Sequence, residues 1–78
     1  MRRRNLLAIH KVKEFAEWAE GEGYVREKTK GIYEVLRLWD PQRCALLVFY
    51  KKDSAKEHVT VYGGGTVLVH RYLRQLKR

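Results

Sequence analysis

The sequence has little of what usually reinforces a small protein. Cys44 is the single cysteine and Pro41 the single proline among 78 residues. One cysteine excludes an internal disulfide and a cysteine-based zinc site, and it is typical of a reducing compartment. The apolar stretch that follows the basic residues 2–4 covers only residues 6–9, which is too short for a signal-peptide core or a membrane span. We therefore expect a cytoplasmic protein without a membrane partner.

Length and charge narrow the range of functions. The chain has room for one small domain with a thin core, so we expect residues 1–78 to form a single domain in which residues 1–5 are a flexible basic arm. Lys and Arg number 17 and Asp and Glu number 9, which gives a formal net charge of +8. A charge of this size favours a polyanionic partner, either nucleic acid or an acidic protein.

Apolar residues recur with helical spacing near both ends of the chain. The first set is Ala8, Val12, Phe15, Ala16 and Ala19, and the second is Val69, Tyr72, Leu73 and Leu76. The first set predicts a helix that Asn5 can cap and that Gly21 or Gly23 ends. The second predicts a helix over residues 67–78 that Thr66 caps, after a turn at residues 63–65.

The middle of the chain has the composition of strands. Residues 24–29 and 32–39 flank Lys30-Gly31 and predict a hairpin, and residues 40–43 are a turn because of Pro41. Residues 44–50 form an apolar run that predicts the central, most buried strand, with Cys44 as a small buried hydrophobe. In residues 58–62 the period of two places Val59 and Val61 in the core.

These elements predict an α+β fold: a two-layer sandwich of helix, antiparallel meander of three to four strands, and helix. Each helix has one apolar stripe, so both must cover the same face of the sheet and leave the other face open. An edge at residues 24–29 or 58–62 can pair two copies, but its Lys and Arg residues oppose this. We expect a monomer or weak dimer.

The candidate binding residues are basic and aromatic. Clusters of cations lie on the first strand, in the loop after the central strand and on the last helix: Arg26, Lys28, Lys30, Lys51, Lys52, Arg71, Arg74, Lys77 and Arg78. They suit contacts to several phosphates, although each cluster alone also suits a solvated surface. Tyr33 and Trp39 share one face of the second strand and are candidates for stacking on bases, with core packing as the alternative.

No set of residues suggests an enzyme. The histidines His10, His58 and His70 lack metal-ligand spacing, and the acids form no paired motif. The glycine run 63–65 lacks the Lys and the spacing of a phosphate-binding P-loop. We therefore expect no catalytic residues, no metal and no cofactor.

Residues 23–33, Gly-Tyr-Val-Arg-Glu-Lys-Thr-Lys-Gly-Ile-Tyr, resemble the Gly-aromatic…Lys-Gly-Ser-His segment of HicA-type toxins, which cleave mRNA and have a fold like the double-stranded-RNA-binding domain. The resemblance implies such a fold and a surface that faces nucleic acid. In that family a histidine is catalytic at the position of Tyr33, and Ile32 replaces the serine. Tyrosine is a weak general base at neutral pH, so the substitution argues against cleavage.

The sequence thus predicts a small, basic, non-catalytic module that binds RNA or DNA through phosphates. A second hypothesis is a phage or mobile-element protein that inhibits or assists a protein complex, for example an anti-defence factor. A third, less favoured, is a HicA-like ribonuclease.

Overall fold

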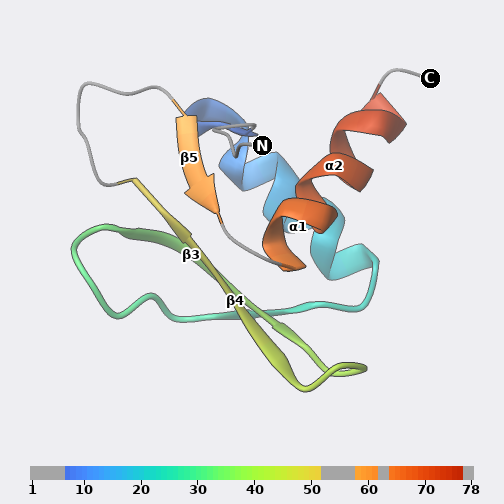
Figure 1. Cartoon of the computed structure of the whole chain (residues 1–78), viewed down its shortest axis with the longest axis horizontal. Coiled ribbons are helices and arrows are strands. Elements are labelled where there is room, and N and C mark those ends of the chain that lie inside the picture. Colours follow the sequence, from blue (N-terminus) through green and yellow to red (C-terminus); the bar gives the residue numbers. More distant parts are fainter. Residues whose placement is uncertain (1–6, 52–57, 62–63, 77–78) are drawn as a thin grey trace.

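Two α-helices flank a run of four antiparallel strands in the computed structural model, which describes residues 7–51, 58–61 and 64–76 (Figure 1). In chain order the elements are β1 (Leu7–Ala8), a 3-10 helix η1 (Ile9–Lys11), α1 (Val12–Gly21), β2 (Val25–Glu27), β3 (Glu34–Asp40), β4 (Ala45–Tyr50), β5 (His58–Val61) and α2 (Gly64–Leu76). All pairings are antiparallel and the strand order is β1-β5-β4-β3-β2. The predicted α+β class is confirmed.

The first helix is shorter than its apolar pattern indicates. Residues 7–8 form strand β1, which pairs with β5, and the α-helix begins only at Val12. Asn5, the expected cap, lies outside the described residues. At the other end Gly23 has a φ of +105°, the left-handed conformation that glycine adopts without strain. Gly23 therefore ends the helix as predicted, and Gly21 is its last residue.

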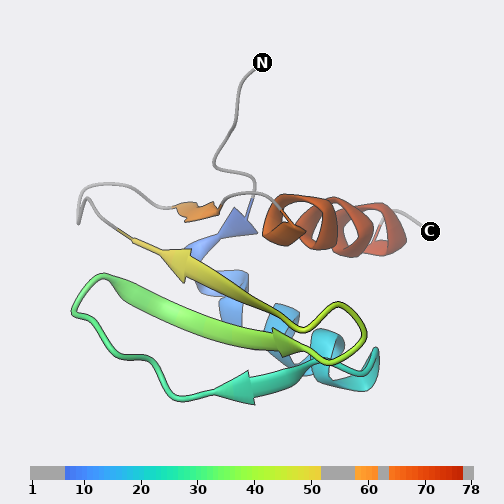
Figure 2. The ribbon, with the colours of Figure 1, turned by 60° about the horizontal axis from the view of Figure 1, so that its bottom comes forward.

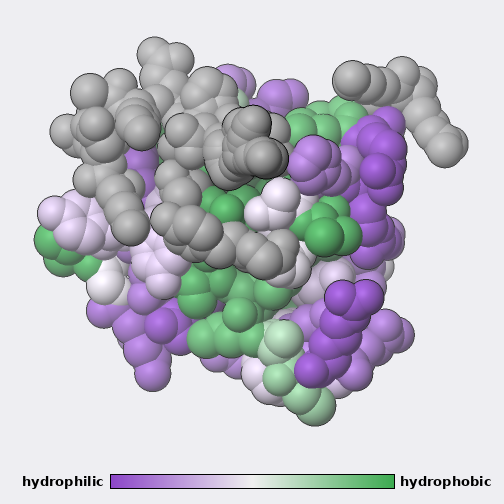
Figure 3. Space-filling model, in the orientation of Figure 1, coloured by the Kyte–Doolittle hydropathy of each residue, from purple (hydrophilic) through white to green (hydrophobic). Residues whose placement is uncertain are grey.

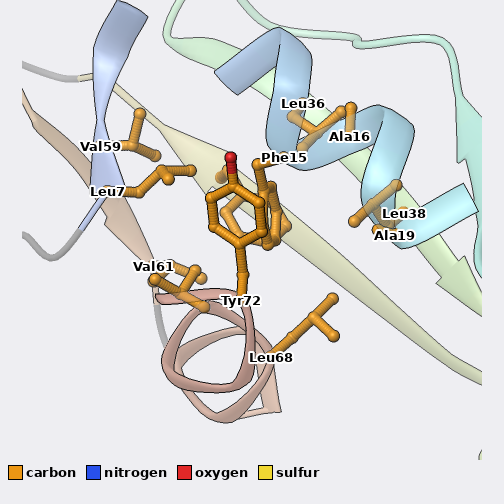
Figure 4. Packing of buried hydrophobic residues seen from close by; sticks show 12 residues of the cluster. Leu7, Phe15, Ala16, Ala19, Leu36, Leu38, Val59, Val61, Leu68 and Tyr72 are labelled. Carbon is orange, nitrogen blue, oxygen red and sulfur yellow. The ribbon is translucent and has the colours of Figure 1, made fainter. Parts of the chain in front are cut away.

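The core lies between one face of the sheet and both helices. Phe15 of α1 packs edge-on against Phe49 of β4 and Tyr72 of α2, with ring centroids 5.3 and 5.2 Å apart. Around this aromatic centre lie Leu7, Ala16, Ala19, Leu36, Leu38, Val59, Val61, Leu68 and Val69, all buried (Figure 4). Val59 and Val61 are in the core as predicted. Phe15, Phe49 and Tyr72 are the largest of the buried side chains, so their burial contributes a large share of the stability.

The hairpin of β2 and β3 differs from the predicted one. Val25 pairs with Trp39 and Glu27 with Arg37, so a six-residue loop, 28–33, joins the strands in place of a two-residue Lys-Gly turn. The Glu34 N–H donates to the Gly31 carbonyl, which places the turn at residues 31–34. The predicted register is therefore wrong by three residues.

A β-bulge at the start of β3 changes which side chains share a face. Glu34 pairs with Tyr50 but Leu36 pairs with Phe49, so Val35 is an extra residue in β3. In a regular strand, residues three apart point to opposite faces; one inserted residue places them on the same face. Glu34 and Arg37 thereby lie side by side.

Strand β4 is central in the sheet, as predicted, but it is not the most buried strand. Phe49 is its one fully buried residue, whereas β3 buries Leu36, Leu38 and Asp40. The difference lies on the helix-facing side, where Ala45 and Leu47 of β4 line a hollow and are only partly buried. Cys44 is also exposed, contrary to prediction, because it ends the turn before β4 with a φ of +51°.

The last helix begins earlier than predicted. Thr66 lies inside α2, where its hydroxyl donates to the Val61 carbonyl at 3.3 Å. Gly65 is buried against Val61 and Phe49, so a glycine here allows close approach of α2 to the sheet. Leu68 is buried and Leu76 exposed, which shifts the apolar stripe toward the start of α2. The view in Figure 2 shows α2 along one side of the sheet.

Candidate nucleic-acid interface

The structure divides the predicted cations into two groups. Lys52, Lys77 and Arg78 lie outside the described residues. Arg26, Arg71 and Arg74 lie at the helical side of the molecule, and Lys28, Lys30 and Lys51 lie around the loop that precedes β3. The described residues carry ten Lys or Arg and seven Asp or Glu, an excess of +3 out of the total of +8. Binding by the described residues therefore depends on where cations gather and not on a uniformly basic surface.

Two arginines of the helical group are held by glutamates near the end of α1. Arg26 donates to Glu20 and Arg71 to Glu22, each at 2.9 Å. Arg71 also lies over the Trp18 ring, 5.7 Å from its centroid. These ion pairs are partly exposed, so each contributes little to stability. They do neutralise the two guanidinium groups, which leaves less positive charge at this side for phosphates.

Two of the lysines around the loop, Lys28 and Lys30, do not lie where the sequence predicts them. The sequence predicts Arg26, Lys28 and Lys30 together on the first strand, but β2 ends at Glu27 and both lysines are exposed loop residues. Arg26 points to the helical face, because it pairs with Leu38, whose side chain is buried there. The three cations therefore do not form one row.

Glu34 fixes the loop by three hydrogen bonds. Its carboxylate accepts the Lys30 N–H at 3.0 Å and two donors of the Arg37 guanidinium at 2.6 and 3.1 Å. The Arg37 hydrogen bond and the Lys30 N–H lower the pKa of the Glu34 carboxyl to about 2. The same pair raises the pKa of Arg37. Glu34 is thus ionised at neutral pH and orders the loop. The sequence does not predict this role of Glu34, because its ion pair with Arg37 depends on the bulge at Val35.

The ordered loop carries an exposed aromatic ring and two exposed lysines, Lys28 and Lys30. Tyr33 is 53% and Ile32 90% exposed. The Lys51 N–H donates to the Tyr33 carbonyl at 2.8 Å, which brings the end of β4 against the loop. We call this surface the loop patch; it consists of Lys28, Lys30, Ile32, Tyr33 and Lys51.

Trp39 is not part of the loop patch. It lies on the open face of the sheet, between Val25 and Leu46 in the neighbouring strands, and is half-buried. Tyr33 precedes the bulge and lies in the loop, so the two aromatics predicted to share a strand face are separated. Of the two, Tyr33 has the exposure that stacking on a base requires.

Two further features concern the described part of the chain. None of its helices is long and apolar enough to cross a membrane, and no group of three His, Cys, Asp or Glu residues is placed to hold a metal ion. Comparison with known proteins gives no relative: no family model, no curated protein and no solved structure matches the chain.

Proposed function

We propose that this protein is a small basic module that binds nucleic acid, with the loop patch as its contact surface. The observation that carries the proposal is the exposed Tyr33 ring on a loop that also presents Lys28 and Lys30 and is ordered by Glu34. An aromatic ring beside cations is the combination with which single-strand binders stack on a base and neutralise the flanking phosphates. The net charge of +8 adds a long-range attraction to the same partner.

The chain layout supports the same proposal. After the two-residue strand β1, a helix, antiparallel strands and a final helix follow the order of the HicA-type family, and the resemblance to that family implies a surface that faces nucleic acid. Tyr33 stands where that family has its catalytic histidine, which supports binding without cleavage. Labelled single-stranded RNA incubated with the purified protein should therefore stay intact; cleavage that Tyr33→Phe abolishes would establish a ribonuclease.

The test is fluorescence anisotropy with single- and double-stranded RNA and DNA at several salt concentrations. Lys28→Ala with Lys30→Ala should weaken binding and reduce the salt slope for a single strand by about 1.4, because each lost phosphate contact contributes about 0.7. Tyr33→Ala should weaken binding about 5- to 150-fold, since stacking contributes about 1 to 3 kcal/mol. Its salt slope should not change, because tyrosine is uncharged.

Two further variants locate the interface. Arg43→Ala removes one charge at the other end of β4 and should leave binding within twofold. Arg71→Ala with Arg74→Ala removes two charges from α2. A fall in salt slope in the α2 variant, together with an unchanged slope in the Lys28 and Lys30 variant, would place the interface on α2 and refute the loop patch.

A further inference from the structure

The fold buries a carboxylate at the end of β3. Among the described residues Asp40 is the one charged residue that is buried, with 9% of its surface exposed. It follows the buried Leu36 and Leu38 at intervals of two along β3, so its side chain lies on the side of the sheet that faces the helices. A buried carboxylate is costly unless its oxygens accept hydrogen bonds.

The two oxygens of the Asp40 carboxylate differ in their partners. Oδ1 accepts the backbone N–H groups of Gln42 and Arg43 at 3.0 and 3.4 Å, which holds the turn before β4. In the described part of the chain no donor reaches the second oxygen, Oδ2, and the Arg43 guanidinium forms no ion pair with this carboxylate. Oδ2 is therefore an acceptor that these residues leave to solvent or to a ligand.

Asp40 lines two neighbouring hollows. The smaller hollow, of about 280 Å³, lies between the end of α1 and the turn that follows β3. The larger hollow, of about 540 Å³, lies between β4 and the start of α2. Tyr24, Gln42 and Arg71 line both hollows together with Asp40. The larger hollow has the volume that binding sites for small molecules usually have.

Apolar side chains from two elements line the larger hollow. They include Leu47 of β4 and Val67 and Leu68 of α2. Leu68 is buried, whereas Val67 is 57% exposed. Figure 3 shows apolar surface where β4 runs beside α2. These walls favour a ligand with an apolar body, because its burial against them removes apolar surface from water.

The charges around the hollows leave Asp40 as the dominant one. Arg71 donates to Glu22 at 2.9 Å, and Glu22 lines the smaller hollow, so these two charges balance each other. Arg43 lines the larger hollow but is an exposed residue, and water screens its charge. The charge of the buried carboxylate is screened less. Oδ2 of Asp40 therefore favours a donor with a positive charge, since charge-assisted hydrogen bonds are the stronger ones.

We propose that the two hollows form a binding site for a small primary amine with an apolar body. The ammonium group donates to Oδ2 of Asp40, and the apolar body lies against Leu47, Val67 and Leu68 in the larger hollow. Asp40 ends β3 and the loop patch precedes it, so the two sites lie at opposite ends of this strand. The amine site does not depend on the proposed nucleic-acid binding.

The test compares 2-phenylethylamine with 2-phenylethanol, which has the same shape and no charge. Each compound is titrated into ¹⁵N-labelled protein at constant pH. The amine should bind at least about tenfold more tightly than the alcohol, and it should shift the amide signals of Gln42 and Arg43, whose N–H groups share the carboxylate. Equal binding of the two compounds, or no shift of these signals at millimolar amine, would overturn the proposal.

A variant of Asp40 isolates the acceptor. Asp40→Asn keeps Oδ1 for the two backbone N–H groups and has an NH₂ group in place of Oδ2, so the turn should persist while amine binding weakens at least about tenfold. Glu17→Gln removes the same charge from an exposed residue of α1 that lines neither hollow, and amine binding should stay within twofold. Equal losses in both variants would refute the role of Asp40. The comparison of amine and alcohol uses the wild type, so it decides the question even where Asp40→Asn does not fold.

The position of the apolar body has its own pair of variants. Val67→Trp should fill the larger hollow and weaken amine binding at least fivefold. Leu76→Trp makes a similar change at a residue of α2 that is 44% exposed and lines neither hollow, so binding should stay within twofold. Equal affinities in the two variants would refute the larger hollow as the place of the apolar body.

Discussion

Gly65 provides a sharp test of the helix packing, because alanine there should have the opposite effect to its usual one in a helix. A methyl group at Gly65 would meet the side chain of buried Val61 at a distance that real contacts do not show, with the Phe49 ring 3.5 Å away on another side. At Gly21, the last residue of α1, the same methyl group meets nothing within 4 Å. Both glycines are helical residues, but only Gly21 has room for a methyl group.

The magnitude follows from two opposing effects. Replacing glycine by alanine in a helix stabilises it by up to about 1 kcal/mol. Forcing a methyl group into a packed core costs about 1 to 3 kcal/mol, since neighbouring side chains must move. Gly65→Ala should therefore be destabilising by about 1 to 2 kcal/mol, and Gly21→Ala should be stabilising by about 0.5 kcal/mol.

Thermal unfolding followed by circular dichroism measures both. A change of 1 kcal/mol shifts the Tm of a domain of this size by about 4 to 8 °C, so Gly65→Ala should lower the Tm by at least 4 °C while Gly21→Ala raises it slightly. A Gly65→Ala protein as stable as the wild type would show that α2 does not approach β4 and β5 this closely. Equal stabilisation by both substitutions would refute the reasoning entirely.

Two further predictions concern the hydrogen bonds that the Glu34 carboxylate accepts from Lys30 and Arg37 and the aromatic centre of the core. Because the folded pKa of Glu34 is lowered from 4.5 to about 2, its contribution to stability is complete above pH 4.5 and is lost as the pH falls toward 2. The free energy of unfolding, measured with urea at pH 5, 3.5 and 2.5, should fall less for Glu34→Gln than for the wild type. Identical declines would show that the ionised Glu34 carboxylate does not stabilise the fold. Phe15→Ala should lower the free energy of unfolding by about 3 to 5 kcal/mol, which is much of the stability of so small a domain. We therefore expect near-ultraviolet circular dichroism to show a largely unfolded chain at 37 °C. A variant that melts cooperatively from a native state would show that Phe15 is not central to the core.

Much of the fold was predictable because periodicity reports burial directly. The apolar spacing from Val12 to Ala19 located α1, and the alternation of Val59 and Val61 located the inner face of β5. The sequence predicts a turn at the glycine run 63–65, whereas Gly64 and Gly65 lie within α2, because a sequence does not show how closely a helix approaches a sheet. Strand β1 was missed since two residues are too few for a period to appear.

The candidate site was less predictable, because it depends on one inserted residue. The bulge at Val35 leaves no pattern in the sequence, yet it brings Glu34 beside Arg37 and so determines the conformation of the loop. The Lys30-Gly31 pair resembled a tight turn, but the Glu34 carboxylate captures the Lys30 N–H and moves the turn along the chain. Ion pairs between distant elements, such as Arg71 with Glu22, are likewise set by tertiary packing alone.

The pairing of β1 with β5 has a consequence for the order in which the protein folds. Leu7 lies opposite Val59, 52 positions further along the chain, whereas β3 and β4 are joined by a short turn. Local pairs close with little loss of chain entropy and distant pairs with much more. The β3–β4 hairpin should therefore form early and β1 should dock last, and in the native protein β1 should detach first. Amide hydrogen exchange should accordingly be faster at Leu7 and Ala8 than at Leu38 and Leu47. Docking of β1, which buries Leu7, is then the last step that completes the core.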